Sequence, residues 1–214
     1  MRVWLPDRPG ALGQVASRIG AVRGDVVGIE IIERGGGRAI DELVVRLPDP
    51  ELLDLLVTEV KAVDGAAVED VRLAPDAPGD PRLDALEAAA DLVAAGTVRE
   101  LLDALVARAS EELAAGWVAL VDGATRSVTA STGGVPALPW LLAFLEGSRS
   151  SAAVAAGDAG PDELACAELA AAEVWVVAGR PGRSLRARER RLLAALARLA
   201  DARSAELVRR VAVA

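Results

Sequence analysis

The sequence predicts an α+β protein built from two domains, on three observations. Short apolar runs with a two-residue period alternate with longer segments whose apolar residues recur at helical spacing. The segment 75–81 is rich in Pro and Asp and has no apolar period, so it reads as a linker. Hydrophobic residues make up 52% of the 214 residues, which is enough for a core in each part. We therefore expect domains over residues 1–74 and 82–214.

The first domain begins with a strand over residues 2–5, in which Val3 and Leu5 share a face. A Pro-Gly turn then leads into a helix that ends at Gly24. We expect Pro9 at the first helical position, where its missing N–H is tolerated. The helix has one apolar stripe, formed by Leu12, Val15, Ala16 and Ile19.

A β-hairpin follows, with strands over residues 26–33 and 40–47. The Gly35-Gly36-Gly37 turn is not a phosphate-binding loop, because no Gly-Lys-Ser/Thr follows it. In the first strand Val27, Ile29 and Ile31 share a face. Asp49-Pro50 then predicts the cap and first residue of a second helix, and residues 68–73 alternate as a fourth strand. The order βαββαβ is that of the ferredoxin-like arrangement.

The second domain begins with two helices. Asp80-Pro81 caps the first, and the capping box over residues 97–100 opens the second. The first of these helices has a narrow apolar seam of Leu83, Leu86, Ala90 and Val93. Later elements are strands over 117–121, 127–131 and 172–179, a short helix over 136–145, and a long final helix marked by Leu192, Leu196, Leu199 and Leu207. Residues 146–163 support no assignment.

Composition argues against several functions. The chain has no His and one Lys, which removes most of the usual general bases and metal ligands, so we expect neither an enzyme nor a metal or cofactor site. Its net charge is −8, which makes it a poor general nucleic-acid binder, although the end from Arg180 onward is basic. Cys166 is the only cysteine, and no membrane span or export signal is evident. These features fit a cytoplasmic protein.

The turn from Asp7 to Leu12 is the strongest candidate site. The unpaired amides of the first helical turn and the positive end of the helix dipole favour a carboxylate or a phosphate. Gly10 would let a ligand approach the backbone closely. The alternative is that Asp7 simply caps the helix, as such residues commonly do. Local sequence leaves both open.

Residues 1–74 resemble an ACT domain, a regulatory module found in proteins of amino-acid metabolism. The resemblance rests on the βαββαβ order, on Ile19, on the motif over residues 24–29 and on Asp7-Arg8-Pro9-Gly10-Ala11-Leu12. It implies binding of an amino acid or related metabolite, at a homodimer interface where two sheets meet side by side. The ligand-binding residues would be Asp7, Arg8, Pro9, Gly10, Ala11, Leu12, Asp25 and Val26.

In that site the ligand carboxylate would lie on the amides around Gly10, and Asp7 or Asp25 would accept its ammonium group. ACT domains often have an amide side chain where this sequence has Asp7 and Asp25. The extra negative charge favours a zwitterionic or cationic ligand, or else marks a loss of binding.

Residues 82–212 resemble a GAF domain, a small-molecule sensor in which helices flank an antiparallel sheet. The residues that carry this resemblance are the closing pattern over 176–182 and the segment 187–193. The resemblance implies a second α+β domain but no particular pocket residue. The alternative function is a dimerisation or protein-interaction scaffold without a metabolite, because the seam and the open sheet edges suit self-association.

Overall fold

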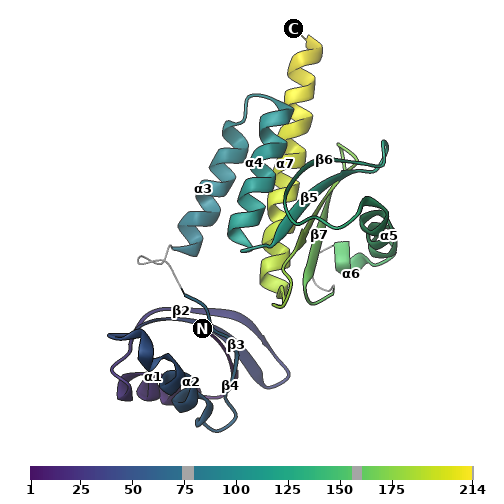
Figure 1. The fold of residues 1–214 in the computed structure, drawn as a ribbon. Helices are drawn as coiled ribbons and strands as arrows, with labels where there is room; N and C mark the ends of the chain where they lie inside the picture. Colours follow the sequence, from purple (N-terminus) through teal and green to yellow (C-terminus); the bar gives the residue numbers. More distant parts are fainter. Residues whose placement is uncertain (74–79, 156–160, 214) are drawn as a thin grey trace. The chain divides into compact units, whose positions relative to one another are not determined.

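The computed structural model describes residues 1–73, 80–155 and 161–213. Contacts within the chain divide it into two compact units, Met1–Gly79 (unit 1) and Asp80–Ala214 (unit 2). Each unit contains a four-stranded antiparallel sheet with helices, which confirms the α+β class (Figure 1). The expected linker 75–81 lies mostly outside the described residues, and Pro81 already belongs to a helix. Over the described ranges, no helix is both long and apolar enough to span a membrane.

Unit 1 has the expected βαββαβ order. Its elements are β1 (Arg2–Pro6), α1 (Ala11–Ala21), β2 (Asp25–Gly35), β3 (Arg38–Arg46), the 3-10 turn η1 (Pro50–Leu52), α2 (Leu53–Lys61) and β4 (Ala67–Asp70). The strand order is β2-β3-β1-β4 and every neighbouring pair is antiparallel. This is the ferredoxin-like arrangement, with β1 and β3 in the centre and β2 and β4 at the edges.

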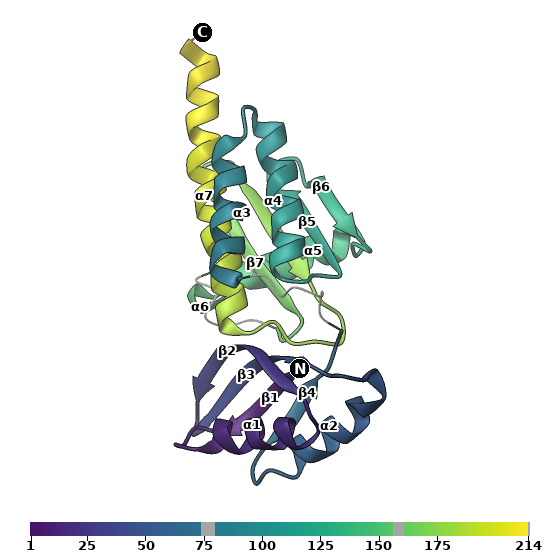
Figure 2. The same ribbon diagram turned by 90° about the vertical axis from the view of Figure 1, so that its left-hand side faces the viewer.

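Both helices of unit 1 cover the same face of its sheet (Figure 2). Their common core is Val3, Leu5, Ala11, Val15, Ile19, Val22, Leu43, Leu56, Val60 and Val63. The predicted stripe of α1 is wrong at Ala16, which is exposed; Ala11 is buried instead, because the inward positions recur every four residues. Gly24 is packed so tightly that an added Cβ would lie 2.8 Å from Ile19 Cγ2.

Unit 2 contains α3 (Pro81–Ala94), α4 (Val98–Glu112), β5 (Trp117–Asp122), β6 (Ser127–Gly133), α5 (Leu138–Arg149), α6 (Ala152–Ala155), β7 (Leu164–Leu169), β8 (Val174–Gly179) and α7 (Ala187–Val213). The strand order is β6-β5-β8-β7, all antiparallel. The strand β7 was not predicted, since its sequence LACAEL has no β-branched residue. The predicted capping box is present, because Thr97 Oγ1 accepts from the Glu100 amide at 3.1 Å.

Helices cover both faces of the sheet in unit 2 (Figure 1). One core cluster joins the sheet to α3, α4 and α7, and a second joins it to α5. Along β8, Val176 belongs to the first cluster, whereas Trp175 and Val177 belong to the second. A strand buried on both faces has a continuous apolar sequence, which explains the run Val174–Ala178.

Candidate functional site

The turn between β1 and α1 differs from a simple capped helix start. Gly10 is the N-cap of α1 and has a left-handed backbone, with φ 88°. An added Cβ there would meet nothing within 4 Å, so the backbone conformation selects glycine. Pro9 therefore precedes the helix, and its predicted place at the first helical position is wrong. Asp7 is not the cap either, because the N-cap position has no side-chain hydrogen bond.

The turn leaves backbone donors without a protein acceptor. The Ala11 amide donates to the Arg8 carbonyl at 3.3 Å, and the Gln14 amide donates to the Gly10 carbonyl at 3.0 Å. Within the described ranges, the amides of Gly10, Leu12 and Gly13 donate to no protein oxygen. Such donors at the positive end of a helix dipole suit an anionic group.

The structure adds one residue that the sequence analysis missed. Asp41 on β3 lies opposite Val3, so its side chain faces the helices. It is only 3% exposed, and its Oδ1 has no hydrogen-bond partner. Burial raises the pKa of Asp41; the positive charge of Arg34 opposes this change and the negative charge of Asp7 adds to it. A buried carboxyl group with one unpartnered oxygen therefore lies within electrostatic reach of Asp7 in the turn.

A sequence signal for Asp41 exists. Inward positions on β3 alternate through Ala39, Asp41 and Leu43, and Asp41 is the only charged residue among these three. A charged residue in an inward row carries a desolvation penalty and is a candidate for function.

Asp25 does not lie near the turn in the same chain. Asp25 pairs with Arg46 at one end of β3, whereas Pro6, just before the turn, pairs with Arg38 at the other end. Eight residues of extended strand span about 27 Å. The expectation that Asp25 is a neighbour of Asp7 is therefore wrong within one chain, because α1 carries the chain back along the sheet before β2 begins.

Comparison with protein-family models, curated proteins and solved structures gives no match for this chain. The turn must therefore be interpreted from its own chemistry. Of the other predicted binding residues, Arg8 is exposed and forms an ion pair with Asp64 at 3.6 Å. Ala11 is buried, and Leu12 and Val26 pack against the core of unit 1. Ala11 and Leu12 hold the turn against the core, whereas Val26 lies beside Asp25 at the other end of the sheet, and none of the three has a polar side chain.

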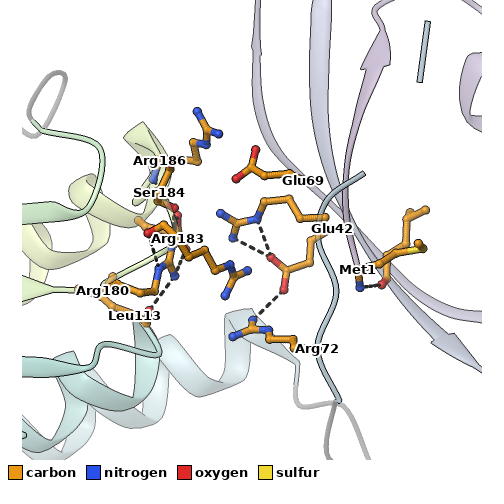
Figure 3. Close-up of polar contacts among 12 residues, drawn as sticks. Met1, Glu42, Glu69, Arg72, Leu113, Arg180, Arg183, Ser184 and Arg186 are labelled. Atoms are coloured by element: carbon orange, nitrogen blue, oxygen red, sulfur yellow. Dashed lines mark hydrogen bonds and ion pairs between the residues drawn. The ribbon is translucent and has the colours of Figure 1, made fainter. Parts of the chain in front are cut away.

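Polar clusters elsewhere hold the fold together (Figure 3). In unit 1, Glu42 accepts hydrogen bonds from Arg2 and Arg72 at 2.8 and 2.9 Å. In unit 2, Arg180 donates to the Leu113 carbonyl at 2.8 Å and to both carboxylate oxygens of Glu189 at 2.7 and 3.0 Å. Arg180 therefore ties the end of β8 to α4 and to α7.

Burial raises the pKa of the Cys166 thiol, and a hydrogen bond with Ser148 opposes this change. Among the described residues, no three His, Cys, Asp or Glu side chains gather in a way that could hold a metal ion.

Proposed function

We propose that this protein is a non-catalytic regulatory protein that binds an amino acid or a related small metabolite through unit 1, as a homodimer. The observation that carries the proposal is the combination of three free amides at the start of α1 with the buried Asp41, whose Oδ1 has no hydrogen-bond partner and which lies within electrostatic reach of Asp7. The ferredoxin-like order of unit 1 and its resemblance to an ACT domain support the same function.

The two ends of an α-amino acid match these groups. The ligand carboxylate would accept hydrogen bonds from the amides of Gly10, Leu12 and Gly13. Its ammonium group would lie against Asp41 and Asp7, as a charge-assisted hydrogen bond requires. A bound cation would favour the ionised form of Asp41, and therefore lower the pKa that burial raises.

The edge strand β2 supports a dimer. It is 11 residues long, pairs with β3 on one side only, and leaves Ile29 and Ile31 51% and 43% exposed. Antiparallel pairing of two β2 strands would bring Asp25 of one copy to the sheet end that carries the turn of the other copy. The second acidic residue of the proposed site would then come from the partner.

A thermal-shift screen against the common amino acids tests this function. A ligand at about 100 times its Kd should stabilise the chain by about 2.7 kcal/mol. Matched probes lacking one end, the α-hydroxy acid and the primary amine, should each bind much more weakly. A flat response to every amino acid would overturn the proposal for this ligand class.

Two variants locate the site. Asp41→Asn should abolish the preference for the amino acid over its α-hydroxy acid, because the ammonium group loses its carboxylate partner. Gly10→Val should remove the shift altogether, since a branched side chain disfavours the left-handed backbone of the turn. Unchanged binding in both variants would place the site elsewhere.

The alternative is a dimerisation scaffold that binds no metabolite, which the open β2 edge with its exposed isoleucines also favours. Light scattering over a dilution series decides this point. A strict monomer at micromolar concentration would exclude the scaffold and would also remove the partner's Asp25 from the site. Weaker association in Ile29→Asp, together with no ligand response of the unmodified chain, would favour the scaffold.

A further inference from the structure

We propose that the outer face of α3 in unit 2 binds the same face of a second copy of this chain, with the two helices parallel. This inference concerns unit 2 and does not rest on the function proposed for unit 1. It identifies a second interaction surface, formed by the seam residues Leu83, Leu86, Ala90 and Val93.

The helix α3 has two different apolar faces. Ala88 and Leu92 are fully buried in the core that α3 shares with α4 and α7. The seam lies on the other side, where Leu83, Leu86 and Val93 are 53%, 68% and 52% exposed. Scattered exposed leucines are common, but these positions recur at intervals of three, four and three residues. That spacing is the a/d pattern of a coiled coil.

The charges beside the seam select a partner and a direction. With Leu83 and Ala90 at a positions, Arg82 is at g and Glu87 is at the following e position. In a parallel pair, the residue at g of one helix contacts the residue at the next e position of the other helix, which is five positions further along the sequence. Arg82 of each copy would therefore contact Glu87 of the other copy, once on each side of the seam. Both residues are exposed, and within the described ranges neither side chain has a hydrogen bond or ion pair.

An antiparallel pair fits less well. In an antiparallel pair e positions face e positions and g positions face g positions, so Glu87 of one copy would lie beside Glu87 of the other and Arg82 would have no acidic partner. The charge pairing therefore favours the parallel arrangement. Since the matching surfaces belong to one and the same helix, a second copy of the chain is the occupant that the charges fit.

The short length of α3 does not argue against the interface. A helix of 14 residues is marginal when isolated. Here the core of unit 2 already holds α3 in place through Ala88 and Leu92, so association does not have to order the helix. Ala90 near the middle of the seam is small enough to let two helices approach closely.

Cysteine cross-linking in the full chain tests the geometry. Leu83→Cys and Val93→Cys, made as separate variants, should each form a disulfide-linked dimer on oxidation, because parallel helices place each seam position opposite itself. The native Cys166 is buried and should not compete. Ala124→Cys, at an exposed turn between β5 and β6, is the matched control and should remain unlinked. Failure of either seam variant to cross-link with itself, or linking only in a mixture of the two, would overturn the parallel pairing.

Two further variants test the energetics. Leu86→Asp should weaken dimerisation through unit 2 at least about tenfold, because it places a charge in the seam. Leu55→Asp, at a comparably exposed leucine of α2, is the control for a charge on a helix surface. In the Leu83→Cys background, Arg82→Glu should lower the fraction of chains that cross-link. The double variant Arg82→Glu/Glu87→Arg should restore that fraction. Absence of restoration would overturn the assigned register.

The result is separable from the function proposed for unit 1. Ile29→Asp, which disrupts the β2 edge, should leave cross-linking at Leu83→Cys unchanged. Leu86→Asp should leave the amino-acid thermal shift unchanged. Loss of the seam cross-link in Ile29→Asp would overturn the assignment of an independent interface to α3.

Discussion

The two units use the same number of strands but cover their sheets differently. In unit 1 helices from the unit cover one face of the sheet, whereas in unit 2 helices cover both faces. As a result β8 is buried along its whole length, and β2 is an open edge with exposed isoleucines. The sheet covered on both faces contributes mainly to the stability of unit 2. The sheet covered on one face leaves an edge strand and a helix N-terminus of unit 1 available for binding.

The largest effect we expect is at the buried ion pair of unit 2. Arg180→Ala should destabilise unit 2 by about 3–5 kcal/mol, because Glu189 and the Leu113 carbonyl lose a buried partner. Arg8→Ala should change unit 1 by less than about 1 kcal/mol, since its pair with Asp64 is exposed. Hydrogen exchange in urea, read from peptides of each unit, measures both. Similar effects for the two would remove the contrast between the units.

Truncating two neighbouring residues of a strand should lower stability by similar amounts only where helices cover both faces of the sheet. Val176→Ala and Val177→Ala should each destabilise unit 2 by about 2 kcal/mol, because each opens a cavity in a different core cluster. Ile29→Ala on the open edge should destabilise unit 1 by less than about 1 kcal/mol. Equilibrium denaturation checks the three values. If either valine-to-alanine substitution left the free energy of unfolding unchanged, the corresponding face of β8 would not be tightly packed.

Two glycine substitutions in unit 1 test whether the turn before α1 requires a left-handed backbone. Gly10→Ala should destabilise unit 1 by about 1 kcal/mol, because alanine disfavours the left-handed backbone. Gly13→Ala adds the same methyl group inside α1, also in open space, and should stabilise by about 0.5–1 kcal/mol. Thermal unfolding compares the pair. Equal effects would show that the backbone of the turn is not strained by a side chain.

The smallest effect concerns pH. The pKa of Asp41 in the folded chain is raised above its ordinary value of 3.8. Between these two pKa values the folded chain holds a proton on Asp41 that the unfolded chain has lost, so the contribution of Asp41 makes the free energy of unfolding fall as the pH rises through that range. Asp41→Asn should remove this part of the pH dependence and raise the melting temperature slightly at neutral pH. Asp25→Asn, at an exposed position, is the control. A wild-type pH profile unchanged by Asp41→Asn would mean that this carboxyl is not desolvated.

The sequence predicted the elements of unit 1 because each has a local signal. Turn glycines, the Asp49 cap and two clear periods place the four strands and two helices close to their observed bounds, except that the fourth strand ends at Asp70 and not at Leu73. The strand β7 has no such signal, since its small residues become a strand only through pairing with β8. Its place in the sheet depends on tertiary context that local propensity does not contain.

The candidate site was predictable only in part. The glycine of the turn follows from local chemistry, but its left-handed backbone moves the helix start past Pro9. The distance between Asp7 and Asp25 depends on the length of α1 and on the register of β3, and motif spacing alone does not give it. Asp41 becomes a candidate once β3 is paired with β1, because this register assigns it to the covered face.

The central position of β1 has a consequence for synthesis on the ribosome. This strand is made before the other strands of unit 1, and its partners β3 and β4 end only at Arg46 and Asp70. At a synthesis rate of about 5–20 residues per second, roughly 3–13 s pass between the synthesis of β1 and that of its last partner strand. During that interval the nascent chain presents an unpaired strand beside an amphipathic helix, the kind of surface to which chaperones bind.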